Sequence, residues 1–267
     1  MAYFKYLLIA FCLGLLLFGC DLEKDITIDL PKHQSQLVVE CYLEPGRKVQ
    51  LLLTESSSYL DSLSSPFVND ALITVTYNNI VDTLFLNTQF EEGYKVYNYI
   101  SNKIVPADFE RDFFLYIKDS KGRTITGKTK LLQAVPIDTA EYKFNEDSLA
   151  YVLMSFEDDT TRENYYRLVV HKDSLTNVVQ RFVFTDEFSE TSKISVGTPY
   201  TFEKGKEAFL TLYHIDESYY KYVRSVDAAR DGNSNPFAQP AMIMSNVGGG
   251  IGIFTGLAFD FRAVRIE

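Results

Sequence analysis

Apolar and polar residues alternate along most of the chain, which is the pattern of half-buried β-strands. The alternation is clearest in 71–77, where Ile73, Val75 and Tyr77 are separated by threonines. Similar short runs, separated by turn residues, occupy 37–43, 49–55, 80–86, 94–100, 112–118 and 123–130. Several short strands at this spacing are typical of an immunoglobulin-like or transthyretin-like sandwich. We therefore predict a mainly β protein with such a sandwich over 30–135.

A second β region is expected after Pro136-Ile137-Asp138, which marks a domain boundary. Short polar connections such as Asp173-Ser174 separate its runs, which indicates antiparallel pairing. The predicted strands are 137–144, 150–157, 165–173, 178–185, 193–203, 207–214, 241–245 and 253–265. The pattern predicts a second antiparallel β domain over 136–267.

Residues 216–230 break this alternation and predict one amphipathic helix. Tyr219, Tyr222 and Val226 recur at helical spacing, so they lie on one face. Asp216 is a suitable N-terminal cap, and Gly232 with its polar neighbours is expected to end the helix.

The N-terminus carries the pattern of a cleaved lipoprotein signal. The apolar run 6–18 follows Lys5 and, as a helix, would span about 20 Å, too short for a bilayer core of about 30 Å. It ends at Leu17-Phe18-Gly19-Cys20, the order of a bacterial lipobox. We expect a signal peptide at 1–19, a diacylglycerol thioether and an acylated amine on Cys20, and a lipidated tether at 20–29. An ordinary secretory signal or a short membrane anchor is the alternative.

The tether bears on which side of the membrane the protein faces. Asp21, Glu23 and Asp25 resemble the surface-export signals of Bacteroidetes lipoproteins. An outer-membrane protein displayed outward is therefore favoured over a periplasmic one, although a plain solvated tether explains the same residues.

Charge and cysteine content exclude several classes of protein. The chain has 26 Lys plus Arg against 36 Asp plus Glu, a net charge of -10, whereas nucleic-acid binding needs a basic face. Three cysteines with no CxxC pair provide neither a disulfide scaffold nor a zinc site. Cys41 lies in an alternating run and is expected to be a small buried hydrophobic residue.

The sequence motifs of known cofactor and metal sites are incomplete. Residues 248–252 (GGGIG) lack the Lys and Ser/Thr of a phosphate-binding loop and are expected to form a tight turn or bulge. Residues 231–235 (DGNSN) space their oxygens as calcium loops do, but Pro236 occupies the place of the required glycine. No metal and no cofactor are expected.

Catalytic residues are equally hard to assemble from the sequence. His33, His171 and His214 belong to no metal-ligand pair, and no GxSxG is present. We expect His171 and His214 to be structural. The run 157–159 (EDD) is either an exposed acidic turn or a pair of working carboxylates.

One C-terminal string points to a family. Residues 235–240 (NPFAQP) and 245–254 (SNVGGGIGIF), with the lipobox, 28–31 (IDLP) ahead of 37–40, and 136–138 (PID), resemble the DUF4249 family of Bacteroidetes outer-membrane lipoproteins. The resemblance covers nearly the whole mature chain, and its one departure is Cys41, where a small residue is typical. It implies an outer-membrane lipoprotein, often encoded beside TonB-dependent receptors, with no established activity or catalytic residues to carry over.

These features favour binding over catalysis. The chain has 18 Tyr and 20 Phe, and surplus tyrosines suit a binding surface as well as half-exposed strand positions. The candidate contact surface is made of Tyr219, Tyr222, Asn235, Phe237, Asn246 and Phe254, although these residues could instead only close the core of the second domain. We predict a non-enzymatic binding or accessory subunit beside a TonB-dependent transporter. The alternatives are a structural envelope lipoprotein and a carboxylate hydrolase.

Overall fold

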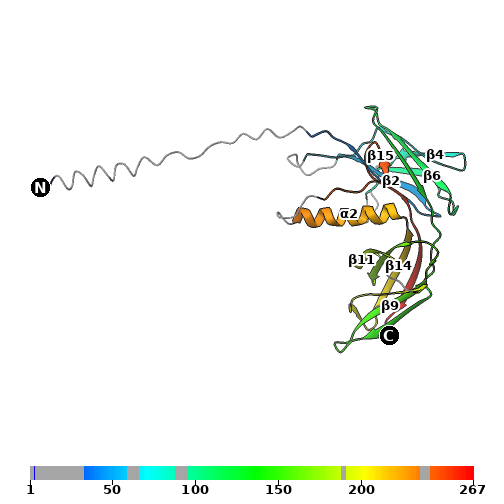
Figure 1. Cartoon of the computed structure of the whole chain (residues 1–267), viewed down its shortest axis with the longest axis vertical. Coiled ribbons are helices and arrows are strands. Elements are labelled where there is room, and N and C mark those ends of the chain that lie inside the picture. The colour runs from blue at the N-terminus through cyan, green and yellow to red at the C-terminus, as the bar shows by residue number, and fades with distance from the viewer. Residues whose placement is uncertain (1–2, 4–32, 59–65, 88–95, 188–190, 235–240) are drawn as a thin grey trace. The chain divides into compact units, whose positions relative to one another are not determined.

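The computed structural model describes residues 3, 33–58, 66–87, 96–187, 191–234 and 241–267, and these are mainly β, as predicted (Figure 1). Ser35–Glu267 forms one compact unit, distinct from Met1–Gln34. Cys20, the tether and all of the predicted signal but Tyr3 lie outside the described residues. Within the described ranges, no helix is both long and apolar enough to cross a membrane.

Ser35–Glu267 contains two β regions, and the first is one nine-stranded sheet with the order β15-β7-β6-β3-β4-β5-β2-β1-β16. Alternate residues along its strands are buried, so Val39, Leu51, Ile73 and Leu115 lie in one core. The strands are β1 (Leu37–Leu43), β2 (Lys48–Glu55), β3 (Leu72–Tyr77), β4 (Ile80–Leu86), β5 (Tyr99–Ile104), β6 (Asp112–Lys118), β7 (Thr124–Lys130), β15 (Val247–Gly248) and β16 (Ile251–Gly256).

The C-terminal segment 247–256 joins the two edges of this sheet. β15 pairs with β7, while β16 pairs with β1 in parallel, and only two residues separate β15 from β16. The backbones approach so closely that a Cβ on Gly252 would collide with the carbonyl oxygen of Val39. Gly249 and Gly252 also have φ of 83° and 135°, which L side chains rarely adopt. Placing this segment in a second domain was therefore wrong, because it completes the first sheet.

The second β region contains two four-stranded sheets that enclose a separate core. In one, β9 (Leu149–Glu157) pairs with β8 (Thr139–Phe144), β12 (Lys193–Gly197) and β13 (Phe202–Glu203). The other has the order β11-β10-β14-β17, with β10 (Tyr165–Lys172), β11 (Val178–Thr185), β14 (Glu207–Ile215) and β17 (Ala258–Arg265). Their facing sides supply Met154, Phe156, Tyr166, Leu168 and Leu212 to the core.

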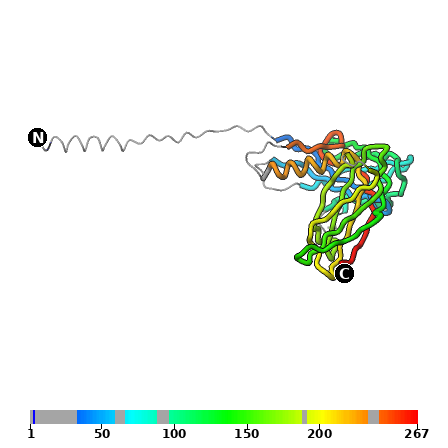
Figure 2. Tube along the Cα trace, turned by 60° about the horizontal axis from the view of Figure 1, so that its bottom comes forward, coloured from blue at the N-terminus to red at the C-terminus, as the bar shows by residue number. Residues whose placement is uncertain are grey.

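Four predicted strands differ from the observed ones. In place of the predicted 94–100, β5 begins at Tyr99 and continues to Ile104. The run 193–203 is broken into β12 and β13, and 241–245 contains no strand. The run 253–265 is divided at Leu257, whose backbone N–H donates to the carbonyl of Leu43 at 2.8 Å. The chain thereby passes from the first sheet into the second, where β17 lies beside β14 (Figure 2). Hydrophobic alternation continues across Leu257, so the sequence alone does not reveal this change of sheet.

The helix α2 (Glu217–Ser234) follows β14 directly. Its predicted cap is confirmed, since an oxygen of the Asp216 carboxylate accepts the backbone N–H of Tyr219 at 2.7 Å. The helix continues through Gly232 to Ser234, one turn beyond the predicted end. A single glycine costs about 1 kcal/mol in a helix, which did not stop this one.

Candidate functional site

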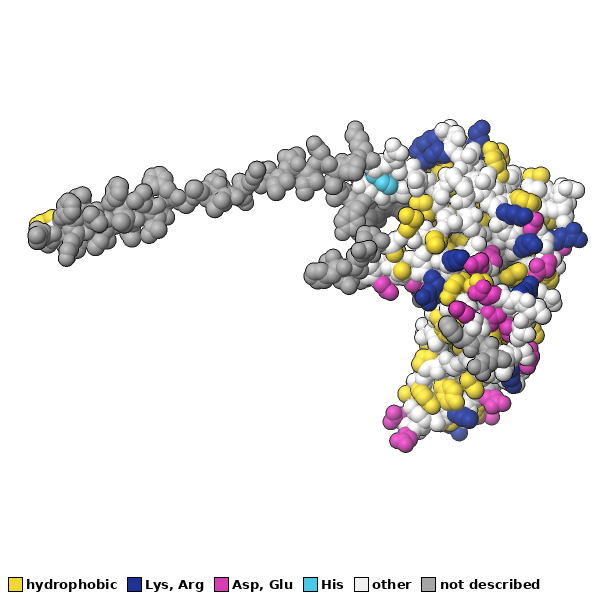
Figure 3. All heavy atoms as spheres, in the orientation of Figure 1, with side chains coloured by type: hydrophobic (Ala, Val, Ile, Leu, Met, Phe, Trp, Pro, Cys, Tyr) yellow, Lys and Arg dark blue, Asp and Glu magenta, His cyan; other side chains and the backbone are white. Residues whose placement is uncertain are grey.

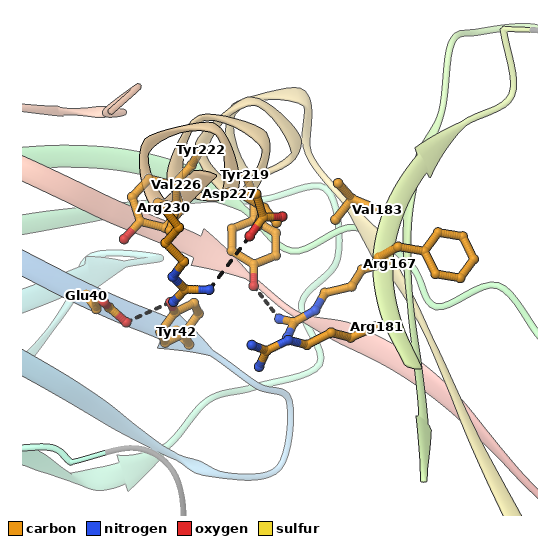
Figure 4. A pocket seen from close by; sticks show the side chains of 12 residues that line it. Glu40, Tyr42, Arg167, Arg181, Val183, Tyr219, Tyr222, Val226, Asp227 and Arg230 are labelled. Atoms are coloured by element: carbon orange, nitrogen blue, oxygen red, sulfur yellow. Dashed lines mark hydrogen bonds and ion pairs between the residues drawn. The ribbon is translucent and has the colours of Figure 1, made fainter. Parts of the chain in front are cut away.

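A pocket of about 220 Å³ lies where α2, β1 and the β10–β11 hairpin meet (Figure 4). Its lining consists of Glu40, Tyr42, Arg167, Arg181, Phe182, Val183, Tyr219, Tyr222, Val223, Val226, Asp227 and Arg230. Since these side chains come from three parts of the chain, the pocket depends on the complete fold.

The hairpin contributes two arginines to the same side of the sheet. Arg167 on β10 is directly opposite Val183, and Arg181 on β11 is directly opposite Val169. In an antiparallel pair this register makes Arg167 and Arg181 diagonal neighbours on one face. Figure 4 shows their guanidinium groups side by side, both directed toward α2.

The helix contributes a stripe of residues at helical spacing. Tyr219, Tyr222 and Val226 recur every three to four residues and face the pocket. Tyr219 is almost fully buried, and the Tyr222 ring lies nearly parallel to it with centroids 6.4 Å apart. Asp216 fixes the first turn, because its second carboxylate oxygen also accepts the hydroxyls of Thr129 and Thr255 at 3.2 Å each.

Strand β1 contributes Glu40 and Tyr42, which lie on the face opposite its core residues. The Tyr42 hydroxyl donates to the Glu40 carboxylate at 3.0 Å. Burial, followed by the neighbouring Tyr219 and Glu40, raises the pKa of Tyr42 far above its ordinary value. Tyr42 is therefore a neutral donor at physiological pH and holds Glu40 in place.

Arg167 is held in the pocket by aromatic residues. One guanidinium N–H donates to the Tyr219 hydroxyl, and the group lies 5.7 and 5.8 Å from the ring centroids of Tyr213 and Tyr219. These are cation–π distances. Burial, with the Glu44 carboxylate, raises the pKa of Tyr213 to about 12. Arg167 therefore has oriented neutral neighbours.

The pocket contains more free cations than anions. Asp227 pairs with Arg230 at 3.7 Å and Glu40 accepts from Tyr42, whereas neither Arg167 nor Arg181 forms an ion pair with any described residue. Elsewhere acidic and basic side chains are interspersed, as the face in Figure 3 shows. Two arginines without acidic partners are unusual in a chain of net charge -10.

A second polar cluster lies on the opposite face of β10. The ring nitrogens of His214 are 2.8 Å from the Gln133 carbonyl and 3.3 Å from the Asn164 side-chain oxygen, and the ring stacks on Tyr166. The Tyr166 hydroxyl donates to the Asp158 carboxylate. Burial, then the nearby Asp186, raises the pKa of Asp158, while burial lowers that of His214. The prediction that His214 is structural agrees with these contacts.

The structure separates the residues of the predicted contact surface. Tyr219 and Tyr222 line the pocket, whereas the Asn246 side chain bonds to the backbone N–H and C=O of Phe254 at 2.9 and 2.7 Å. Phe254 is fully buried in the first core, so assigning it to a surface was wrong. Asn235 and Phe237 lie outside the described residues.

The pocket arginines were missed because each occupies an ordinary outward position in an alternating strand. The signal that could have found them is the hairpin register, which places two cations diagonally on one face without an acidic residue between them. The sequence contains this information only once the turn at 173–177 is known.

Other predicted sites are resolved more simply. Cys41 is buried, as expected, and burial raises the pKa of its thiol. Asp158 is buried, so the acidic run 157–159 is not simply an exposed turn. Asp231 lies within α2 instead of in a calcium loop. Within the part of the chain that the structure describes, no three His, Cys, Asp or Glu residues are grouped to hold a metal ion.

Comparisons with known proteins identify a family and little else. The model of a family described as a domain of unknown function (DUF4249) matches residues 23–260. No curated protein matches. Among solved structures, a cytokine receptor complex is similar with 9% identity and a TM-score of 0.29, covering 85% of this chain and 95% of that one. Chicken CNTN1 FN1-FN3 domains match with 12% identity and a TM-score of 0.26, over 66% and 59% of the two chains.

Proposed function

The chain belongs to the DUF4249 family, and on that premise we propose that it is a non-enzymatic binding subunit anchored to the outer membrane through lipid on Cys20. It works beside a TonB-dependent receptor and is displayed on the outer face of the membrane. The lipobox pattern, the acidic residues after Cys20 and the family resemblance support the anchor and the partner.

The observation that carries the binding role is the pocket beside α2. It brings Arg167, Arg181 and Tyr219 together in one concave site of about 220 Å³. Concave sites that combine aromatic surface with a few converging polar groups are typical ligand sites. Tyr222 adds a second aromatic face at the same site.

A pull-down from native membranes tests the proposed partner. The full chain with a tag after Glu267, an exposed residue, is solubilised in mild detergent, and co-purifying proteins are identified by mass spectrometry. Stoichiometric recovery of a TonB-dependent receptor is the expected result. Recovery of no such receptor from fully solubilised membranes would contradict the accessory role and favour a structural envelope lipoprotein.

The anchor is tested separately. Mass spectrometry of the mature N-terminal peptide should find Cys20 modified by diacylglycerol and an acyl chain, and Cys20→Ala should release the protein from membranes. Lipid chains contribute about 0.8 kcal/mol per buried CH₂, so their loss removes stable anchoring. A Cys20→Ala chain that still partitions wholly into membranes would rule out this anchor.

One observation favours a second candidate function, hydrolysis by paired carboxylates. Asp158 has a raised pKa because of burial and the nearby Asp186, as general acids often have. The expected result is that Asp158→Asn and Asp186→Asn change no turnover of glycoside or ester substrates. Turnover by the wild-type chain that is lost in either variant would promote the hydrolase instead.

A further inference from the structure

The pocket offers hydrogen-bond donors that the described residues leave unused. A guanidinium group has five N–H donors and no acceptor. Among the described residues, Arg167 donates through one of them, to Tyr219. Arg181 is exposed and donates to no described residue. The two arginines therefore bring to the pocket several donors that no described residue accepts.

Tyr219 adds a donor of a different kind. Its hydroxyl oxygen accepts from Arg167, so its own proton is available for another acceptor. The hydroxyl is a neutral donor because burial raises the pKa of Tyr219. Figure 4 shows this hydroxyl beside the two guanidinium groups. Three donor groups from β10, β11 and α2 thus converge on one volume.

The acidic side chains that line the pocket do not satisfy these donors. The Glu40 carboxylate accepts from Tyr42, and Asp227 pairs with Arg230 on its own helix. Arg167 and Arg181 are like charges on diagonal positions, and their repulsion is relieved when an anion binds between them.

We infer that this pocket binds an oxyanion, a carboxylate or phosphate group of a small ligand, through Arg167, Arg181 and the Tyr219 hydroxyl. Planar guanidinium groups bind both kinds of group in bidentate fashion. The volume of about 220 Å³ is large enough for a small anion or the anionic end of a larger ligand. This inference names the ligand class for the proposed binding site and rests on that proposal.

Calorimetric titration of the purified full chain in non-ionic detergent tests the inference. Inorganic phosphate and benzoate are titrated separately at constant ionic strength, and we expect saturable 1:1 binding of at least one. Tighter binding of phosphate assigns a phosphate ligand, whereas tighter binding of benzoate assigns a carboxylate that uses the Tyr219 and Tyr222 rings. Failure of both anions to bind would overturn the inference.

Variants locate the binding. Arg181→Gln and Arg167→Gln should weaken it about 10- to 100-fold, since each removes a charge-assisted hydrogen bond. Arg181 is exposed, so its variant stays folded even if Arg167→Gln does not. Arg111→Gln is the matched control: Arg111 is exposed and pairs with Asp108 outside the pocket. Equal affinity in wild type and Arg181→Gln would overturn the site.

The outcome is distinguishable from that of the pull-down. Anion binding lost in Arg181→Gln, with no receptor recovered, leaves the oxyanion site standing and removes the accessory role. Recovery of a receptor without anion binding would leave the accessory role standing and remove the oxyanion site.

Discussion

Tyr166 and Arg167 are neighbours on β10 that point to opposite faces of the same sheet. The polar clusters around them differ in how many of their hydrogen-bond donors have partners among the described residues. On the core face, Tyr166 donates to Asp158, and the ring nitrogens of His214 lie 2.8 Å from the Gln133 carbonyl and 3.3 Å from the Asn164 side-chain oxygen. On the outer face, Arg167 donates to Tyr219, and its other N–H groups donate to no other described residue. A buried cluster whose polar groups contact one another stabilises the fold, whereas a pocket with unused donors is available to a ligand.

The largest expected effect comes from removal of the His214 ring. His214→Ala removes the ring that contacts the Gln133 carbonyl and the Asn164 side-chain oxygen, and it creates a cavity beside Tyr166. We expect the free energy of unfolding to fall by about 3 kcal/mol, measured by urea denaturation.

His171→Ala is the matched control for that variant. His171 is on the same strand as Tyr166 but only half-buried, and its Nδ1 has no hydrogen-bond partner among the described residues. Its loss should cost about 1 kcal/mol or less. Equal losses of unfolding free energy in His214→Ala and His171→Ala would contradict the structural role of the cluster around His214.

The pH dependence of the unfolding free energy tests the same cluster at Asp158. Its pKa is raised in the folded state, so the folded protein binds this proton more tightly than the unfolded chain. The stabilisation that this proton gives the folded protein is complete below the ordinary Asp pKa of 3.8. It is lost as the pH rises through the pKa of the folded state. Asp158→Asn should abolish this loss, as measured by urea denaturation across the pH range.

The neighbouring Asp159 supplies the control. It is exposed, and hydrogen bonds from Thr161 lower its pKa, so Asp159→Asn should leave the fall in stability above the ordinary Asp pKa in place. If both variants change the pH dependence of stability alike, that dependence does not come from Asp158.

The sequence predicted the strands and the helix well because local patterns determine them. Ile73, Val75 and Tyr77 are buried in alternation, and Asp216 caps α2 as expected. It could not predict that β16 pairs with β1, because about 210 residues separate the paired positions and no local signal encodes the contact. The glycines at 249 and 252 indicated a tight turn, and only the fold explained which backbones they allow to meet.

The candidate site was predicted only in part for the same reason. Tyr219 and Tyr222 stood out through their helical spacing, while Arg167 and Arg181 gain significance only when β10 and β11 are in register. A charge without a partner is a property of the three-dimensional arrangement, so composition did not reveal it.

The smallest expected effect concerns stability at Arg181. Arg181→Gln should change the free energy of unfolding by no more than about 0.5 kcal/mol, in the stabilising direction at low salt, because it removes a repulsion from Arg167. High salt should cancel the gain by screening. A clear loss of stability, measured by urea denaturation in both salt conditions, would show that Arg181 serves the fold.

The most direct test of the contrast between the two faces of β10 is the increase in unfolding free energy that the bound anion produces. It is measured with whichever of phosphate or benzoate binds, in wild type, His214→Ala and Arg181→Gln. At about 100 times the dissociation constant, the increase should be about 2.7 kcal/mol in wild type. We predict the same increase in His214→Ala, despite its lower stability, and a much smaller one in Arg181→Gln. An increase that is lost in His214→Ala and retained in Arg181→Gln would contradict the assignment of structure to one face and ligand binding to the other.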